Sequence, residues 1–489
     1  MGLLQDDLQK SVKELRDLLA LHSTSSVLGW CFNHVILGQQ RKPEEALESP
    51  DRQISFFLGV LLSSPEPALP LEFDRSDWDR AKALLNRVSS AYVQLYMPGD
   101  GDLKHLTPEW RRVREVAMGA FLHYFNTGLL ASVEQIKDRI AAYLAPFDRK
   151  LEELIGISAT AAIEICRFIT DKLQGNLDRL VTSAEEENKQ RHAMLHRAET
   201  EAKSIAEFRQ LAANDPWAEK ARELLGGLQQ LGRITLGEIE TAFPSTAQGF
   251  WKQFTIERGE GPEISYPTEQ SVYDFRPLIR MDRETVFCIN GNSLFSAVLR
   301  IGEKCLAESD TRTKFLRTRD KSLEIEVARH ARALFGPDAT IWQEVYETPI
   351  AQIEHDIIAF DKHLCLVLEA KASPPVEPFR DPEKAFTRIR DAFRGDKGIQ
   401  KAYEQGNRIV RRIRDGETIH LYGVNGSEVG QLTASTSEFV ACACVTRDDF
   451  GPLATNLSLL LEKTPDDSFP WATNIIDLAT IAEAWQYFK

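Results

Sequence analysis

Hydrophobic residues in the first part of the chain recur with the period of an α-helix. From Trp78 to Tyr96 they return every three or four positions, which is the spacing of a helix that buries one face. The segments Val113 to Leu122 and Ile136 to Tyr143 repeat this pattern. We therefore predict an all-helical region over residues 1–215, with a regulatory or oligomerisation role.

A charged helical segment follows in the same region. Ser158 is placed to cap a helix that runs to Ile169, because a serine hydroxyl accepts a hydrogen bond from the exposed N–H groups of a first turn. The segment Asn176 to Gln210 keeps helical spacing, but residues 185–191 include no apolar side chain. This interruption favours a long solvated helix over a coiled-coil arm, which would make the chain a homodimer.

The pattern changes after Asn214-Asp215-Pro216, a turn signal that we interpret as a boundary. Residues 216–270 are predicted to be a connector, and residues 271–489 an α/β domain with a mixed central sheet, because strands and helices alternate there. Asn425-Gly426 predicts a hairpin turn. The predicted strands are 285–290, 340–347, 353–360, 364–371 and 439–445, and the predicted helices are 293–306, 322–335, 383–393, 399–414 and 475–488.

Composition adds limits to this picture. The chain has 489 residues, of which 43% are hydrophobic, enough for more than one core. A formal net charge of −14 excludes a surface that is basic throughout, but it does not exclude a local basic cleft. The seven cysteines are scattered in apolar runs, which indicates reduced, buried thiols. We expect a cytoplasmic protein, since the sequence shows neither a signal peptide nor an apolar run of about 20 residues.

Candidate chemistry lies where two apolar strands meet at Asp361-Lys362, a predicted tight turn. Symmetric pairing about this turn places Asp356 opposite Val367. Side chains alternate along a strand, so Glu369 and Lys371 share a face with Val367 and hence with Asp356. Three charged side chains would then occupy one face of an apolar hairpin, where unpaired charges are costly.

This combination of residue types suits the cleavage of a phosphodiester. Two carboxylates on adjacent strands can hold a hard divalent ion, which activates a water molecule and stabilises the charge that develops on phosphate. A lysine beside them can orient the water or offset that charge. The alternative is that the three residues are ordinary solvated strand ends.

The same residues resemble a known signature. Asp356, followed after twelve residues by Glu369-Ala370-Lys371, is similar to the motif of the PD-(D/E)xK nuclease superfamily. The proline of that motif is absent, since His355 precedes Asp356. The resemblance extends from about Ser322 to Val445 as a pattern of helix, strand, hairpin and helix. It implies a restriction-endonuclease-like fold and a nuclease that uses Mg²⁺ or Mn²⁺, with Asp356 and Glu369 as metal ligands and Lys371 as a catalytic residue.

Two further residues follow from the resemblance. It implies an acid on the helix before the hairpin, for which Glu324 and Glu326 are candidates. We prefer Glu324, also as a metal ligand, because it lies three residues before Val327, in the register that the family shows. It also implies a glutamine on the helix after the hairpin, for which we prefer Gln405 to Gln400. The alternative for each residue is an exposed position on a helix surface.

A basic segment follows the hairpin. Residues 378–414 contain eleven Lys or Arg against five Asp or Glu, a net charge of +6. A basic surface beside the motif would neutralise phosphates and release counterions, whereas the alternative is a solvated amphipathic helix. The predicted nucleic-acid-binding residues are Arg388, Arg390, Arg394, Lys397, Lys401, Arg408, Arg411 and Arg412.

Three histidines lie near the motif in the sequence. His355 alternates with Asp356, so it is predicted to face away from it. We interpret His330, His355 and His363 as structural or surface residues, with His330 the main alternative for a catalytic role.

Two functions from different classes are consistent with these features. The first is a Mg²⁺-dependent nuclease that cleaves DNA in host defence or restriction and is regulated by its helical half or by a protein partner. DNA repair is the competing biological role, and this step is an analogy. The second is a catalytically inactive nuclease-like fold that binds nucleic acid or a protein. No glycine-rich phosphate-binding loop is evident, so we do not expect ATP hydrolysis.

Overall fold

The computed structural model describes residues 2–37, 46–98, 106–126, 133–202, 204–205, 207, 230–372 and 381–488. Contacts divide the chain into two compact units. The helical unit is Gln5–Ser89 with Ile136–Leu306, and the sheet unit is Met1–Leu4 with Ser90–Gln135 and Ala307–Lys489. Each unit is assembled from segments that are distant in sequence, whereas the predicted region, connector and domain are consecutive ranges. The predicted boundary at Asn214-Asp215-Pro216 lies outside the described residues.

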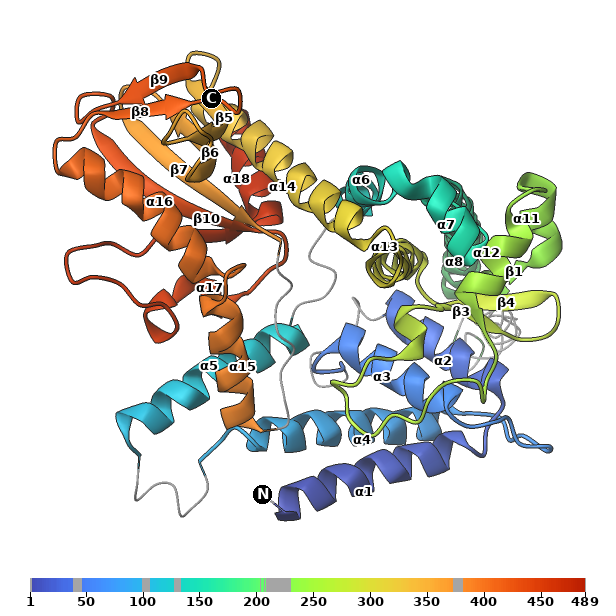
Figure 1. The fold of residues 1–489 in the computed structure, drawn as a ribbon. Coiled ribbons are helices and arrows are strands. Elements are labelled where there is room, and N and C mark those ends of the chain that lie inside the picture. Colours follow the sequence, from blue (N-terminus) through green and yellow to red (C-terminus); the bar gives the residue numbers. More distant parts are fainter. Residues whose placement is uncertain are drawn as a thin grey trace. The chain divides into compact units, whose positions relative to one another are not determined.

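The helical unit contains helices and a small four-stranded sheet (Figure 1). The strand order is β1-β4-β3-β2, in which β2 and β3 are parallel and the other neighbours are antiparallel. Where a connector was predicted, the described residues form β1, α11, α12 and β2. The elements are α1 (Gly2–Leu19), α2 (Thr24–Leu37), α3 (Pro50–Leu62), α4 (Arg75–Gln94), α6 (Val133–Tyr143), α7 (Asp148–Ile155), α8 (Ala159–Glu201), β1 (Arg233–Thr235), α11 (Leu236–Ala242), α12 (Ala247–Phe254), β2 (Thr255–Ile256), β3 (Leu278–Arg280), β4 (Thr285–Cys288) and α13 (Gly291–Glu308).

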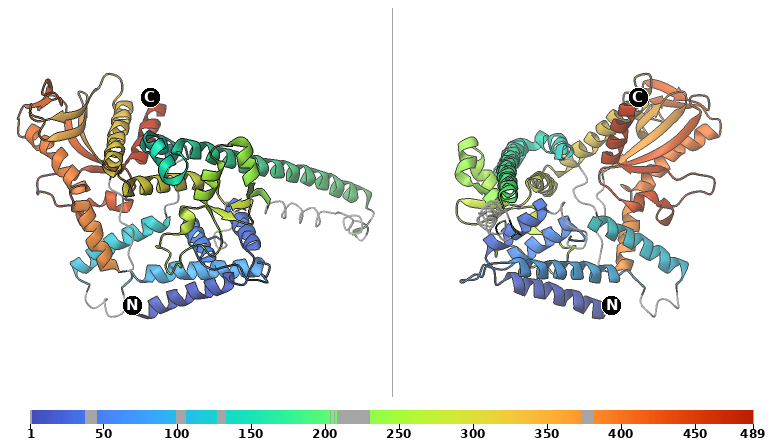
Figure 2. Two further views of the ribbon diagram at one scale, coloured as in Figure 1. Left: turned by 45° about the vertical axis from the view of Figure 1, so that its right-hand side comes forward. Right: turned by 180° about the vertical axis from the view of Figure 1, so that it is seen from behind.

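Helix α8 joins two segments that were predicted as separate helices. The N–H of Ala161 donates to the Ser158 Oγ at 3.2 Å, which confirms Ser158 as the cap. The helix then runs without interruption for 43 residues and extends beyond the other helices of its unit (Figure 2). No described side chain from Asp171 onward in α8 is buried, as expected of a solvated helix.

The sheet unit is built on a mixed seven-stranded sheet with the order β11-β10-β7-β6-β5-β8-β9. Strands β5, β6 and β7 follow one another antiparallel, while β10 lies parallel to both β7 and β11. Its elements are α5 (Pro108–Asn126), α14 (Arg312–Phe335), β5 (Thr340–Tyr346), β6 (Glu354–Phe360), β7 (Leu364–Lys371), α15 (Pro382–Arg394), α16 (Ile399–Arg414), β8 (Ile419–Tyr422), β9 (Glu428–Leu432), β10 (Phe439–Thr446), α17 (Pro452–Thr455), β11 (Trp471–Asn474) and α18 (Ile475–Phe488).

Most elements of this unit match the sequence pattern. The predicted strands and helices from residue 340 onward are confirmed to within one residue at each end. Helix α14 ends where predicted, at Gly336, whose φ of 95° favours glycine, but it begins ten residues earlier than predicted, at Arg312. The turn at Asn425-Gly426 joins β8 to β9, and Gly426 has the positive φ that such a turn requires.

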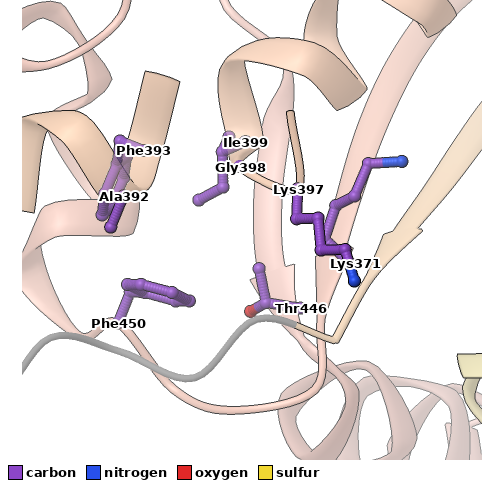
Figure 3. Close-up of a pocket in the computed structure, with 8 residues that line it drawn as sticks. All are labelled: Lys371, Ala392, Phe393, Lys397, Gly398, Ile399, Thr446 and Phe450. Atoms are coloured by element: carbon purple, nitrogen blue, oxygen red, sulfur yellow. The ribbon is translucent and has the colours of Figure 1, made fainter. Parts of the chain in front are cut away.

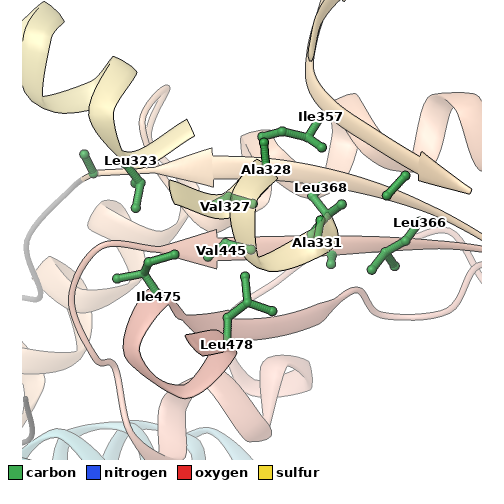
Figure 4. Close-up of a cluster of buried hydrophobic side chains, with 13 residues drawn as sticks. Leu323, Val327, Ala328, Ala331, Ile357, Leu366, Leu368, Val445, Ile475 and Leu478 are labelled. Carbon is green, nitrogen blue, oxygen red and sulfur yellow. The ribbon is translucent and has the colours of Figure 1, made fainter. Parts of the chain in front are cut away.

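Both faces of the sheet are covered. Helices α14 and α18 pack on one face, where buried side chains of α14 and α18 meet those of β6, β7 and β10 (Figure 4). Helix α16 packs on the opposite face (Figure 1). The buried side chains on the α16 face include Val345, Ile358, Val367, Ile409 and Ile413. Polar groups at the centre of this sheet are therefore withdrawn from water, and each needs a partner.

Two further observations concern the whole chain. Among the described residues, no helix combines the length and the apolar character needed to cross a membrane. Six of the seven cysteines are buried, as predicted, and Cys305 is half-buried.

Candidate active site

The hairpin that carries Asp356 and Glu369 pairs in a different register from the predicted one. Val367 lies opposite Ile358 and not opposite Asp356. The shift arises because the N–H of Asp361 bonds to the carbonyl of Leu364, so the two turn residues lie one position later than predicted. A shift of the partner by two residues leaves the paired residues from Ile357 to Phe360 on the faces that the prediction gave them.

Regular pairing of β6 with β7 ends just before the charged residues. The last pair is Ile357 with Leu368. Beyond it, the Asp356 Oδ2 accepts a hydrogen bond of 2.7 Å from the backbone N–H of Ala370. The Asp356 side chain therefore bonds the β7 backbone directly beside Glu369, and it does not simply stand on the face that was predicted.

Glu369 is the most deeply buried member of the group, with 0% of its surface exposed. Its Oε1 lies 3.1 Å from the His355 Nδ1. Its Oε2 is buried and has no hydrogen-bond partner. The Lys371 Nζ is 4.0 Å from this oxygen, too far for a hydrogen bond. A buried carboxylate oxygen without a partner is costly, so it requires an explanation.

The surroundings of the Asp356 carboxyl disfavour its ionised form. Burial and the charge of Glu369 raise the pKa of Asp356 to about 7, although Lys371 and the N–H of Ala370 oppose this shift. Two nearby carboxylates disfavour each other's ionised form, and a cation between them would reverse that effect. The two acids, one of which has an oxygen without a hydrogen-bond partner, are therefore suitable ligands for a hard divalent ion.

Lys371 and Gln405 come together from β7 and α16. The Lys371 Nζ donates to the Gln405 Oε1 at 3.2 Å. Gln400, the less favoured candidate, bonds instead to Glu404 and to the carbonyl of Glu462. Lys371 also lines a small pocket beside Lys397 (Figure 3). The structure thus brings Gln405, and not Gln400, to the motif lysine.

The two candidate helix acids lie in different surroundings. Glu324 bonds to Lys321 at 3.0 Å, and its pKa is raised by burial and by the charge of Asp356. Glu326 instead lies 3.8 Å from the His330 Nε2. Within the described part of the chain, no three His, Cys, Asp or Glu side chains converge closely enough to hold a metal ion. The charge of Asp356 therefore affects the pKa of Glu324, but Glu324 does not complete a three-ligand set with Asp356 and Glu369 in this structure.

His355 was predicted to face away from Asp356, and the structure shows that it contacts the other motif acid, Glu369. Its side chain is fully buried between two acids, with the Nδ1 facing Glu369 and the Nε2 lying 3.1 Å from the Glu347 Oε1. Burial lowers the pKa of His355, but the hydrogen bonds with Glu347 and Glu369 outweigh it and raise the pKa to about 9. Glu347 is a member of this site that the sequence analysis did not identify.

The reason is a break in strand alternation. Val345 of β5 lies opposite His355 and packs on the α16 face, where Ile358 also packs. His355 and Ile358 therefore face the same side although they are three residues apart. Between the regular pairs, Glu344 adopts a φ of 48°, outside the range of an extended strand. Strict alternation, on which the prediction rested, does not hold at this position.

The other two histidines have partners outside this group. The His330 Nε2 lies 3.1 Å from the Arg329 Nη2, and His330 is buried. His363 is exposed at the hairpin turn, with its Nδ1 3.2 Å from the Glu438 Oε1. These positions fit the structural and surface roles predicted for them.

Many of the predicted nucleic-acid-binding residues form ion pairs within the chain. Arg408 and Arg412 both pair with Glu347, Arg411 pairs with Asp467, and Arg394 pairs with Glu462. Arg390 pairs with Asp391, while Arg388 and Lys401 are exposed. The net charge of +6 therefore overstates the basic character of this surface, because acids from outside residues 378–414 offset part of it.

Comparison with known proteins gives no further assignment. No family model matches the chain, and neither the curated proteins nor the solved structures contain a significant match.

Proposed function

We propose that the sheet unit is a metal-dependent nuclease that cleaves DNA, as the resemblance to the PD-(D/E)xK superfamily implies. The observation that carries the proposal is the buried group at the ends of β6 and β7. Glu369 has an unpartnered carboxylate oxygen, Asp356 lies beside it, and Lys371 approaches within 4.0 Å. The succession of α14, β5, the β6–β7 hairpin, α15 and α16 also supports the proposal, because the resemblance implies this order of elements.

Each residue has a distinct task in this proposal. Asp356 and Glu369 would hold a Mg²⁺ or Mn²⁺ ion, which when bound would supply an activated water and a counter-charge for phosphate. Lys371 would place its ammonium near the phosphate, where it offsets developing negative charge. The Gln405 carbonyl oxygen, as acceptor from the Lys371 Nζ, would fix the direction of that side chain. Exclusion of water by the surrounding core strengthens all of these interactions.

The test is a cleavage assay of the full chain with plasmid, linear double-stranded DNA, single-stranded DNA and RNA, each with Mg²⁺, Mn²⁺ or EDTA. We expect metal-dependent cleavage of DNA, lost in Asp356→Asn and Lys371→Met. Lys362→Met is a matched control, because Lys362 lies at the turn, at the opposite end of the hairpin from Lys371. Cleavage that persists in both site variants, or that does not need metal, would contradict the proposal.

A second function is favoured by one specific observation. The site residues already have partners within the chain, since Glu369 bonds to His355 and five of the predicted phosphate-binding arginines are paired with acids. A catalytically inactive unit that binds nucleic acid or a protein partner would also show this arrangement. Calorimetric titration with Mn²⁺ separates the two functions, because only the nuclease requires binding that Asp356→Asn removes.

A further inference from the structure

We infer that Glu347 and His355 are positioning residues that hold Glu369 for metal binding. This inference rests on the proposed function and names residues that lie outside the signature. His355 contacts one oxygen of Glu369, and the other oxygen has no hydrogen-bond partner. A carboxylate held through one oxygen presents the second in a fixed direction, which is how residues behind a metal ligand orient it.

The histidine is itself held from the other side. Its Nε2 lies 3.1 Å from the Glu347 Oε1, so the ring is fixed between two carboxylates. Glu347 has only 3% of its side chain exposed. It also forms ion pairs with Arg408 and Arg412 of α16, which places two guanidinium groups behind a single acid. A network of polar side chains therefore runs from α16 to the centre of the sheet. It consists of Arg408 and Arg412, then Glu347, His355 and Glu369.

The backbone beside this polar network has positive φ angles that support a positioning role. All the non-glycine residues with positive φ in the described part of the chain, Glu344, Ala351 and Ile353, lie in or next to the β5–β6 connection. A β-branched residue such as Ile353 adopts this conformation only when its surroundings impose it. The same connection carries Glu347 and leads into His355. Strained backbone beside a buried polar network is typical of segments that place functional side chains.

A purely structural role would predict a different outcome from a positioning role. If the histidine only filled space, its replacement would lower stability without changing the affinity of the folded protein for a metal ion. If it orients Glu369, its replacement should weaken metal binding roughly 10- to 100-fold, the usual effect of removing a partner of a metal ligand. The two roles are therefore separated by an equilibrium binding measurement that does not depend on catalysis.

The experiment uses the full chain as wild type, His355→Ala, His355→Asn and Glu347→Gln. Mn²⁺ affinity is measured by calorimetry without DNA, and the fraction of folded protein by thermal unfolding in EDTA. The Mn²⁺ concentration for half-maximal cleavage and the maximal cleavage rate are then determined for each variant, to find which of the two changes. We expect a large loss of affinity in His355→Ala and a smaller loss in His355→Asn, whose amide can still donate to Glu369. His363→Asn, a change at an exposed histidine of the same hairpin, should leave the affinity unchanged.

The outcomes are distinguishable. Equal Mn²⁺ affinity of wild type, His355→Ala and Glu347→Gln would overturn this inference while leaving the nuclease intact. No Mn²⁺ binding by the folded wild-type chain would overturn the proposed function and this inference together. Should His355→Ala fail to fold, Glu347→Gln still decides, because it keeps the size of the side chain and removes only the charge behind the histidine.

Discussion

The packing of α16 against β10 allows a quantitative prediction about Gly406. This glycine is buried in the middle of α16, and a Cβ at its position would overlap the Cys442 Sγ. In an exposed helix, replacing glycine by alanine stabilises by about 1 kcal/mol. Here the extra methyl group is forced into a packed interface, which typically costs about 1–3 kcal/mol. We therefore expect Gly406→Ala to reduce the free energy of unfolding by up to about 2 kcal/mol.

The cause can be isolated with a second substitution. Cys442→Ala removes the Sγ, after which the nearest remaining atom of that side chain is its Cβ at 3.4 Å, an ordinary contact. In this background Gly406→Ala should stabilise by about 1 kcal/mol, so the two substitutions should show a coupling energy of about 1–3 kcal/mol in a double-mutant cycle. Urea denaturation of the four proteins measures it. If Gly406→Ala stabilised the wild-type chain as much as it stabilises Cys442→Ala, the overlap argument would be refuted.

Three further predictions concern other parts of the chain. Hydrogen bonds from Arg411 hold the pKa of Asp467 well below its usual range, so the contribution of Asp467 to stability is present above a pH of about 4 and is lost as the pH falls further. The stability difference between wild type and Asp467→Asn should therefore shrink in acid, as unfolding at several pH values would show. Lys401 is exposed, whereas Arg411 forms an ion pair with Asp467. Lys401→Ala should therefore reduce the slope of the logarithm of the DNA-binding constant against the logarithm of salt concentration by about 0.9, and Arg411→Ala should reduce it by less. Fluorescence anisotropy at several salt concentrations measures both slopes. A slope unchanged in Lys401→Ala would exclude a phosphate contact there. Ser158→Ala should lower the free energy of unfolding of the helical unit by about 1 kcal/mol, and Ser158→Thr by less, because only the alanine removes the cap of α8.

The sequence predicted the elements of the sheet unit well because their signals are local. The position of β7 follows from a continuous apolar run, that of α16 from helical apolar spacing, and the end of α14 from Gly336. The choice of Gln405 over Gln400 rested on its place beside the apolar stripe, which fixes the side of the helix that meets the sheet. These inferences need only the spacing of apolar residues along the chain and the chemistry of single residues.

The remaining features depend on backbone conformation or on distant partners. The side of the sheet that His355 faces reflects a break in strand alternation beside Glu344, whose positive φ is not predicted by the identity of a glutamate. The pairing of Arg408 with Glu347 joins residues far apart in sequence, so a charge count over one segment could not include it. The sequence did not predict that α8 continues through residues 170–175, a stretch that includes Gly175, because glycine is a poor helix former.

The β5–β6 connection has a consequence for how this chain would respond to selection. Glycine accepts a positive φ without steric cost, so at Ala351 and Ile353 the present residues hold the backbone in a conformation that they do not favour. Selection for thermal tolerance alone would be expected to accept glycine there. Selection for activity would act instead on the backbone conformation itself, in which the Glu347 N–H donates to the Ile353 carbonyl.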